Sequence, residues 1–116
     1  MCLEILLYIH FKRCVKLFYM NEKEIESYFK WAVMSLGGKT YKFRSINQRG
    51  VSDQIACLPN GDAWFVELKA PNGKLSELQK FFEKEVMGLS QKYACLWTKE
   101  QIDEWLEATG LPRVSR

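Results

Sequence analysis

The residues of greatest chemical interest are an aspartate and a Glu-x-Lys triplet that follows it along the chain. Asp53 comes directly after Gly50-Val51-Ser52, and Glu67 and Lys69 lie on either side of Leu68. Two carboxylates can hold a hard divalent cation, and Glu67 and Lys69 share one face of a strand because strand side chains alternate. Charges gathered on a sheet face need a partner such as a metal ion or a phosphate. The pattern therefore predicts a metal site.

The turn between the two carboxylates predicts how they are paired. In Pro59-Asn60-Gly61, proline suits the first position of a three-residue hairpin loop and glycine suits its left-handed last position. That loop places Asp53 opposite Glu67, and opposed residues share a face. A two-residue loop would place Asp53 opposite Leu68 instead. Taken singly, Asp53 reads as a turn residue and Glu67 as part of a solvated strand edge, but the matching register favours the metal site.

The composition is that of one globular domain with a modest positive charge. The chain has 116 residues, of which 47% are hydrophobic, and a net charge of +3. One core can therefore form, and the global charge argues only weakly for nucleic acid. Residues 39–49 hold basic side chains and no acidic one (Lys39, Lys42, Arg44 and Arg49). This segment leads into the Asp53 motif and is interpreted either as phosphate-binding or as a solvated strand and loop.

The cysteines and the histidine argue against several other kinds of site. The 4 cysteines show no C-x-x-C spacing, and His10 is the only histidine. A zinc site and a Ser-His or Cys-His nucleophile are therefore not expected. An enzyme built on this chain would need a metal or a carboxylate to activate its nucleophile. The scattered cysteines indicate a reducing compartment, so we expect the protein to be cytoplasmic.

Residues 1–19 differ from the rest of the chain. Their apolar run is too short to span a bilayer and lacks the basic start and cleavage site of a signal peptide. Asn21 and Glu24 form a helix-start signal. We therefore expect Met20 to be the natural initiator, residues 1–19 to be an upstream extension and residues 20–116 to be the domain. The alternative is an amphipathic segment that packs on the domain or on a partner.

Apolar periodicity and turn residues predict seven elements in the order α-β-β-β-α-β-α. The helices are expected over residues 21–36, 76–87 and 102–108, and the strands over residues 40–45, 52–58, 63–69 and 93–97. Because a helix separates the last strand from the third, these two strands can pair in parallel. The prediction is an α/β domain with a central mixed sheet flanked by helices.

Five motifs then carry a family resemblance. They are Arg49–Asp53, the Pro59-Asn60-Gly61 turn, Phe65–Pro71, Gly73–Ser76 and Gln79. In combination they resemble the VRR-NUC family of the PD-(D/E)XK nuclease superfamily, over about residues 21–106. Ser52 stands where the superfamily name has proline, at a position that tunes a turn and carries no ligand.

The resemblance implies both a fold and an activity. It implies a restriction-endonuclease-like fold and Mg²⁺- or Mn²⁺-dependent hydrolysis of DNA phosphodiesters, at branched structures such as Holliday junctions. It also implies a homodimer that acts in a bacterial or phage-infected host cell, with no membrane association. Two other functions remain open. One is a catalytically inactive nucleic-acid-binding or interaction domain on the same fold, and the other is a nonspecific or restriction-type nuclease.

The resemblance also assigns roles to individual residues. Asp53 and Glu67 are expected to bind the metal together with the Leu68 carbonyl. Lys69 is expected to orient the attacking water or to stabilise charge on the phosphate. Gln79 matches the family's glutamine near the scissile phosphate.

Other residues have weaker assignments. Glu26 matches the family's helical acid and is a further metal ligand, with Glu22 as the alternative and a solvated helix face as the simpler interpretation of either. Ser76 and Gln79 also form a capping box, which is a purely structural interpretation of Gln79. The residues expected to contact DNA phosphates are Arg44, Arg49 and Lys74.

Overall fold

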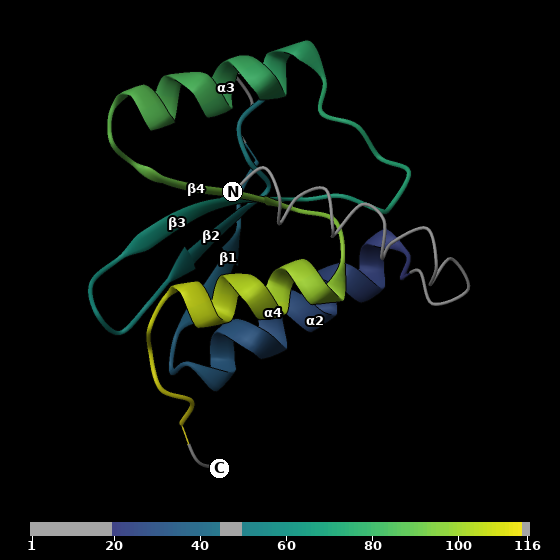
Figure 1. The fold of residues 1–116 in the computed structure, drawn as a ribbon. Helices are drawn as coiled ribbons and strands as arrows, with labels where there is room; N and C mark the ends of the chain where they lie inside the picture. The colour runs from purple at the N-terminus through teal and green to yellow at the C-terminus, as the bar shows by residue number, and fades with distance from the viewer. Residues whose placement is uncertain (1–19, 45–49, 115–116) are drawn as a thin grey trace.

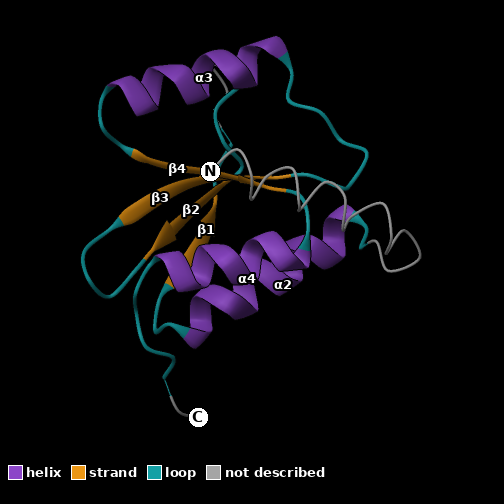
Figure 2. Cartoon of the chain, in the orientation of Figure 1, coloured by secondary structure: helices purple, strands orange, loops and turns teal. Residues whose placement is uncertain are grey.

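Four strands form one mixed sheet that lies between two layers of helices (Figure 1, Figure 2). The computed structural model describes residues 20–44 and 50–114. The elements are α2 (Glu22–Ser35), β1 (Lys39–Lys42), β2 (Gln54–Cys57), β3 (Ala63–Leu68), α3 (Glu77–Gly88), β4 (Lys92–Leu96) and α4 (Lys99–Ala108). Helices α2 and α4 cover one face of the sheet, and α3 lies on the other. The predicted α/β architecture is confirmed.

The predicted element order is confirmed, and the boundaries differ at a few ends. Helix α4 begins at Lys99, earlier than expected, because the Thr98 hydroxyl accepts a hydrogen bond from the Gln101 N–H and so caps the helix there. Strand β2 is shorter than expected because its pairing with β3 begins only at Gln54. None of the described helices is long and apolar enough to cross a bilayer. Residues 1–19 lie outside the described residues.

The strand register agrees with the predicted three-residue loop. The strands run in the order β1-β2-β3-β4, with antiparallel pairs except for the parallel pair of β3 and β4. Gln54 lies opposite Val66, so one step further along the ladder Asp53 comes opposite Glu67. Gly61 ends the loop with φ 90°, the left-handed conformation that glycine adopts at little cost. Turn chemistry thus sets which residues face each other at the site.

The hydrophobic core lies between the sheet and the α2/α4 layer. The rings of Phe29 on α2 and Trp105 on α4 have centroids 5.1 Å apart, and Val66 and Leu68 of β3 join them in the same cluster. Full burial of a side chain of this kind stabilises the fold by about 1.5–3 kcal/mol. Because alternate residues of β3 point to this core, the residues between them, including Glu67, point to the α3 face.

We predict that Gly61→Ala destabilises the domain by about 1 kcal/mol, because the Cβ of an L-residue in the left-handed region comes too close to its neighbouring carbonyl oxygen. A Cβ at Gly61 would meet nothing within 4 Å. The loss of stability would therefore come from the backbone conformation and not from a clash with another residue. Denaturant unfolding would measure it. Gly88→Ala is the matched control, because its Cβ also meets nothing within 4 Å and its φ is not positive. Gly88→Ala should leave stability unchanged or raise it, and equal losses in both variants would contradict the prediction.

Candidate active site

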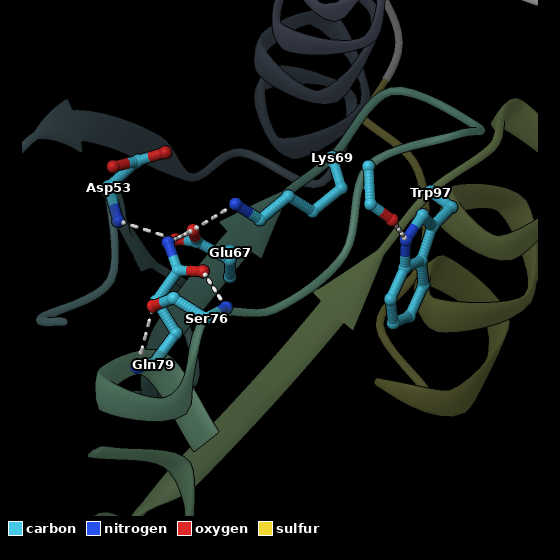
Figure 3. Close-up of polar contacts among 7 residues, drawn as sticks. Asp53, Glu67, Lys69, Ser76, Gln79 and Trp97 are labelled. Carbon is cyan, nitrogen blue, oxygen red and sulfur yellow. Dashed lines mark hydrogen bonds and ion pairs between the residues drawn. The ribbon is translucent and has the colours of Figure 1, made fainter. Parts of the chain in front are cut away.

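Three charged residues converge on the α3 face of the sheet, near the end of β3. Figure 3 shows Asp53, Glu67 and Lys69 side by side, with Gln79 of α3 next to them. Glu67 belongs to β3 and Lys69 follows its last residue. Asp53 precedes β2 and is fixed on its other side, because its carbonyl accepts a hydrogen bond of 2.7 Å from the Phe43 N–H. The structure therefore brings the three predicted residues together.

Glu67 is the buried centre of this group. Only 1% of its surface is exposed. Its Oε2 accepts a hydrogen bond of 3.1 Å from the Asp53 N–H, and its Oε1 accepts one of 2.5 Å from Gln79 Nε2. The Lys69 Nζ lies 3.4 Å from the same Oε1. Two neutral donors and one cation thus hold a carboxylate that burial alone would disfavour.

Both carboxyl groups of the site have raised proton affinity, and burial is the main cause for each. Burial raises the pKa of Glu67 above its usual 4.5, and the nearby Asp53 charge adds to the rise, while the Asp53 N–H and Lys69 lower it. Burial also raises the pKa of Asp53, against the lowering effect of Lys69. Both pKa values stay raised although Lys69 lowers each of them and Lys42 and Arg44 also lower that of Asp53. A bound cation would favour the ionised form of both.

The residues present fit a site for a small, hard divalent cation. Among the described residues, the Asp53 carboxylate has no hydrogen bond or ion pair, so its oxygens are available. The Lys69 N–H donates to the Leu96 carbonyl of β4. In a trans peptide the preceding carbonyl points the opposite way, so the Leu68 oxygen points away from β4, toward the side where Asp53 lies. Two carboxylates and a carbonyl can thus converge.

The described residues contain no group of three or more His, Cys, Asp or Glu side chains placed to hold a metal. This small ligand set suits Mg²⁺, which is commonly held by one or two carboxylates together with waters and substrate phosphates. Glu26, the predicted helical ligand, lies on α2 with its Oε2 3.5 Å from Lys42 Nζ. Its charge is close enough to raise the pKa of Asp53. Glu22 is exposed at the first position of α2.

Gln79 both caps helix α3 and contacts the candidate active site. Its Oε1 accepts from the Ser76 N–H at 2.8 Å, and its own N–H donates to the Ser76 hydroxyl at 3.1 Å, which completes a capping box at the start of α3. The same amide uses its Nε2 to hold Glu67. One side chain therefore links the helix start to the buried carboxylate (Figure 3). The expected contact with a phosphate stays a prediction.

The loop before Asp53 packs directly on α3. Gly50 has φ 85°, and a Cβ there would lie 2.4 Å from the carbonyl oxygen of Leu78. Only glycine satisfies both conditions, so the chain can approach the helix that carries Gln79. The sequence singles out this glycine only as part of the motif before Asp53. Its packing partner comes from a distant segment.

The loop after Lys69 is fixed by a tryptophan that the sequence did not single out. Trp97 follows β4, and its Nε1 donates a hydrogen bond of 2.9 Å to the Gly73 carbonyl (Figure 3). A Cβ at Gly73 would lie 3.3 Å from the Lys69 Cβ, so the loop backbone lies against the lysine stem. With 19% of its side chain exposed, Lys69 is held by this loop. Its ammonium is directed toward Glu67.

Ser52 occupies a buried position next to Asp53. It is 1% exposed, and its hydroxyl has no hydrogen-bond partner among the described residues. An environment that offers the hydroxyl nothing suits an apolar ring at least as well. The position is therefore compatible with the proline named in the superfamily motif.

Of the three residues predicted to bind phosphates, two are described by the structure, and both are exposed. Arg44 is exposed just after β1, and its charge lowers the pKa of Asp53, so it lies within electrostatic reach of the site. Lys74 is exposed in the loop that leads to α3. Arg49 lies outside the described residues.

Comparison with known proteins addresses the fold. No family model matches the chain. A solved structure described as a VRR_NUC domain superposes on this chain with a TM-score of 0.70 and 26% sequence identity. The aligned region covers 74% of this chain and 94% of the solved chain. The resemblance to the VRR-NUC family is confirmed. The VRR-NUC fold is restriction-endonuclease-like, so the predicted fold is confirmed as well.

A curated sequence relative agrees with the VRR-NUC match. The chain is 43% identical over 60 residues to "Putative nuclease p44" of Acyrthosiphon pisum secondary endosymbiont phage 1. The match covers 52% of this chain and 64% of that relative, which is less than two thirds of the relative's length.

We predict that Asp53→Asn stabilises the metal-free protein near pH 7. Because the folded state raises the Asp53 pKa, the stability linked to this carboxyl is lost as the pH rises through the raised value. Asparagine carries no charge, so the variant should melt a few degrees higher than the wild type, and the gap should close as the pH falls toward 3.8, the usual Asp value. Thermal melts across this pH range would measure it.

The same melts test metal binding without measuring activity. Mn²⁺ or Mg²⁺ should raise the melting temperature of the wild type by mass action and have much less effect on Asp53→Asn. A wild type that does not respond to either ion, together with a less stable variant at pH 7, would contradict the assignment.

Proposed function

We propose that this protein is a divalent-metal-dependent nuclease that hydrolyses phosphodiester bonds in DNA. The observation that carries the proposal is the convergence of Asp53, Glu67 and Lys69 at one point on the α3 face, where Glu67 is buried yet ionisable. The VRR-NUC fold and the name of the phage relative support it. Burying the Glu67 carboxylate beside a second carboxylate is unfavourable for the fold alone, and a bound cation would offset that cost.

The chain's own residues divide the work of the reaction. Asp53 and Glu67, with the Leu68 carbonyl, hold Mg²⁺ or Mn²⁺. The metal, when bound, supplies Lewis-acid activation of the phosphodiester and lowers the pKa of a nearby water. Lys69, whose ammonium lies 3.4 Å from Glu67 Oε1, orients the attacking water or stabilises negative charge at the phosphate. Gln79 is a positioning residue, since it acts through Glu67.

Several finer features belong to the same proposal. The substrate is branched DNA such as a Holliday junction, and the active form is a homodimer, whose two-fold symmetry would present two sites to two strands. Glu26, or alternatively Glu22, completes the metal site. Arg44, Arg49 and Lys74 contact phosphates. The protein acts in the cytoplasm of a bacterium or of a phage-infected host.

A direct cleavage assay tests the proposal. Asp53→Ala and Glu67→Ala should each abolish cleavage while DNA binding persists, because phosphate contacts come from other residues. The measurement uses a four-way junction, a flap, a linear duplex and a single strand, each with Mg²⁺, with Mn²⁺ and with EDTA. Glu77→Ala is the matched control, because this carboxylate is exposed on α3 and pairs only with Lys80 among the described residues.

The outcomes separate the possible functions. Near wild-type cleavage by either variant in Mg²⁺ would contradict the site assignment. DNA binding by the wild type without cleavage in either metal would identify a noncatalytic binding domain on the same fold. Equal cleavage rates on junction and linear duplex, with a monomer in light scattering, would support a nonspecific nuclease instead of a junction-specific one.

A pair of variants tests the positioning role of Gln79. Gln79→Ala removes the Nε2 donor to Glu67 and should lower the cleavage rate about tenfold or more, since a charge-assisted hydrogen bond at a reacting site stabilises by roughly 1.5–3 kcal/mol. Ser76→Ala removes the cap hydroxyl and leaves the Gln79 Nε2 in place. It should cost about 1 kcal/mol of stability and leave the rate within about twofold. Equal rate losses would mean that Gln79 serves only as a cap.

A further inference from the structure

Helix α3 covers only part of the sheet face that carries the site. Its Phe82 ring packs against Phe65 of β3 and Tyr93 of β4, with ring centroids 5.7 and 6.4 Å apart. Figure 1 shows α3 above the β4 side of the sheet, with β1 at the far edge. The β1 side of this face therefore has no helix over it among the described residues.

Two aromatic side chains stand on this open half of the face. Tyr41 is 51% exposed and Phe43 is 41% exposed. Tyr41 lies opposite Ile55, and Phe43 continues the same ladder with its N–H bonded to the Asp53 carbonyl. Because opposed residues share a face, both rings lie on the face of Asp53 and Glu67. Phe43 belongs to the same cross-strand row as the two carboxylates.

The surroundings of these rings are basic. Lys39 lies on the same face, with its Nζ 5.1 Å from the centre of the Tyr41 ring. Arg44 follows Phe43, and its positive charge lowers the pKa of Asp53. The sequence from residue 39 to residue 44 is Lys-Thr-Tyr-Lys-Phe-Arg, with no acidic residue. Lys39 therefore lies beside the rings on their own face, whereas Lys42 points to the α2 face and pairs with Glu26.

We propose that Tyr41 and Phe43 form a stacking platform for unpaired bases of the DNA strand that enters the active site. Alternate residues of a strand are roughly 6.8 Å apart, which leaves room for successive unstacked bases. Aromatic rings on a sheet face stack bases of single strands in this way, while neighbouring cations follow the phosphates. The inference rests on the proposed function and narrows its substrate class to DNA with unpaired nucleotides next to the cleavage site.

Another occupant of this surface would be a second copy of the chain, paired along the β1 edge. The charges favour nucleic acid, because such an interface would bring Lys39, Lys42 and Arg44 of one copy close to those of the other. Interface cores are depleted in charged residues. A polyanion bound over the rings instead complements Lys39, which lies beside Tyr41, and Arg44, which follows Phe43.

Equilibrium binding without metal tests the platform separately from catalysis. Tyr41→Leu and Phe43→Leu keep apolar bulk and remove the ring, and both positions are exposed, so the variants should fold. Fluorescence anisotropy in EDTA would use a labelled oligothymidine and a linear duplex of equal length. We expect each variant to bind the oligothymidine about tenfold more weakly and the duplex within about twofold of the wild type. Tyr41→Trp and Phe43→Trp should keep single-strand binding.

Trp31→Leu is the control, because this exposed tryptophan lies on α2, on the other side of the sheet. It should bind both DNAs like the wild type. Unchanged single-strand binding in Tyr41→Leu and Phe43→Leu, or equal losses on both DNAs, would overturn the platform. So would a dimer that becomes monomeric in these variants without any change in single-strand affinity. If the wild type cleaves no DNA in Mg²⁺ or Mn²⁺ while Tyr41→Leu and Phe43→Leu still lose single-strand binding selectively, the proposed nuclease is refuted and the platform stands.

Discussion

The whole site depends on keeping the Glu67 carboxylate buried and correctly aimed. An isolated carboxylate in this position would protonate or turn outward, since the loss of hydration is not recovered by packing. Donors from three separate segments prevent this: the backbone before β2, the side chain after β3 and the first turn of α3. Each segment is fixed by a feature that has no direct contact with Glu67. The site is therefore a property of the assembled fold.

The sequence predicted those parts of the structure that local chemistry controls. The order of the elements followed from apolar periodicity and caps, and the pairing of Asp53 with Glu67 followed from the turn at Pro59-Asn60-Gly61. A tight turn sets the register within a few residues, so no distant information is needed. The parallel pairing of β3 and β4 followed from the helical crossover between them.

Long-range packing could not be predicted in the same way. The bond from Trp97 to the Gly73 carbonyl joins segments that no periodicity relates, and the approach of Gly50 to Leu78 is equally nonlocal. The sequence placed Gln79 both in a cap and near the reaction, but only the structure shows that one amide serves two partners. Tyr41 and Phe43 are exposed because α3 does not extend over the β1 side of the sheet. The alternation of residues along β1 does not predict how far a distant helix extends.

The tight hairpin has a consequence for the lengths that this segment can tolerate. Side chains alternate along a strand, so inserting or deleting one residue in the paired strands between Asp53 and Glu67 would turn one carboxylate to the opposite face, into the α2/α4 core. Inserting or deleting one residue in each strand would leave both carboxylates on the same face of the sheet. Homologous chains should therefore vary in this hairpin by even steps, and an engineer who wishes to graft a new loop here should lengthen both strands together.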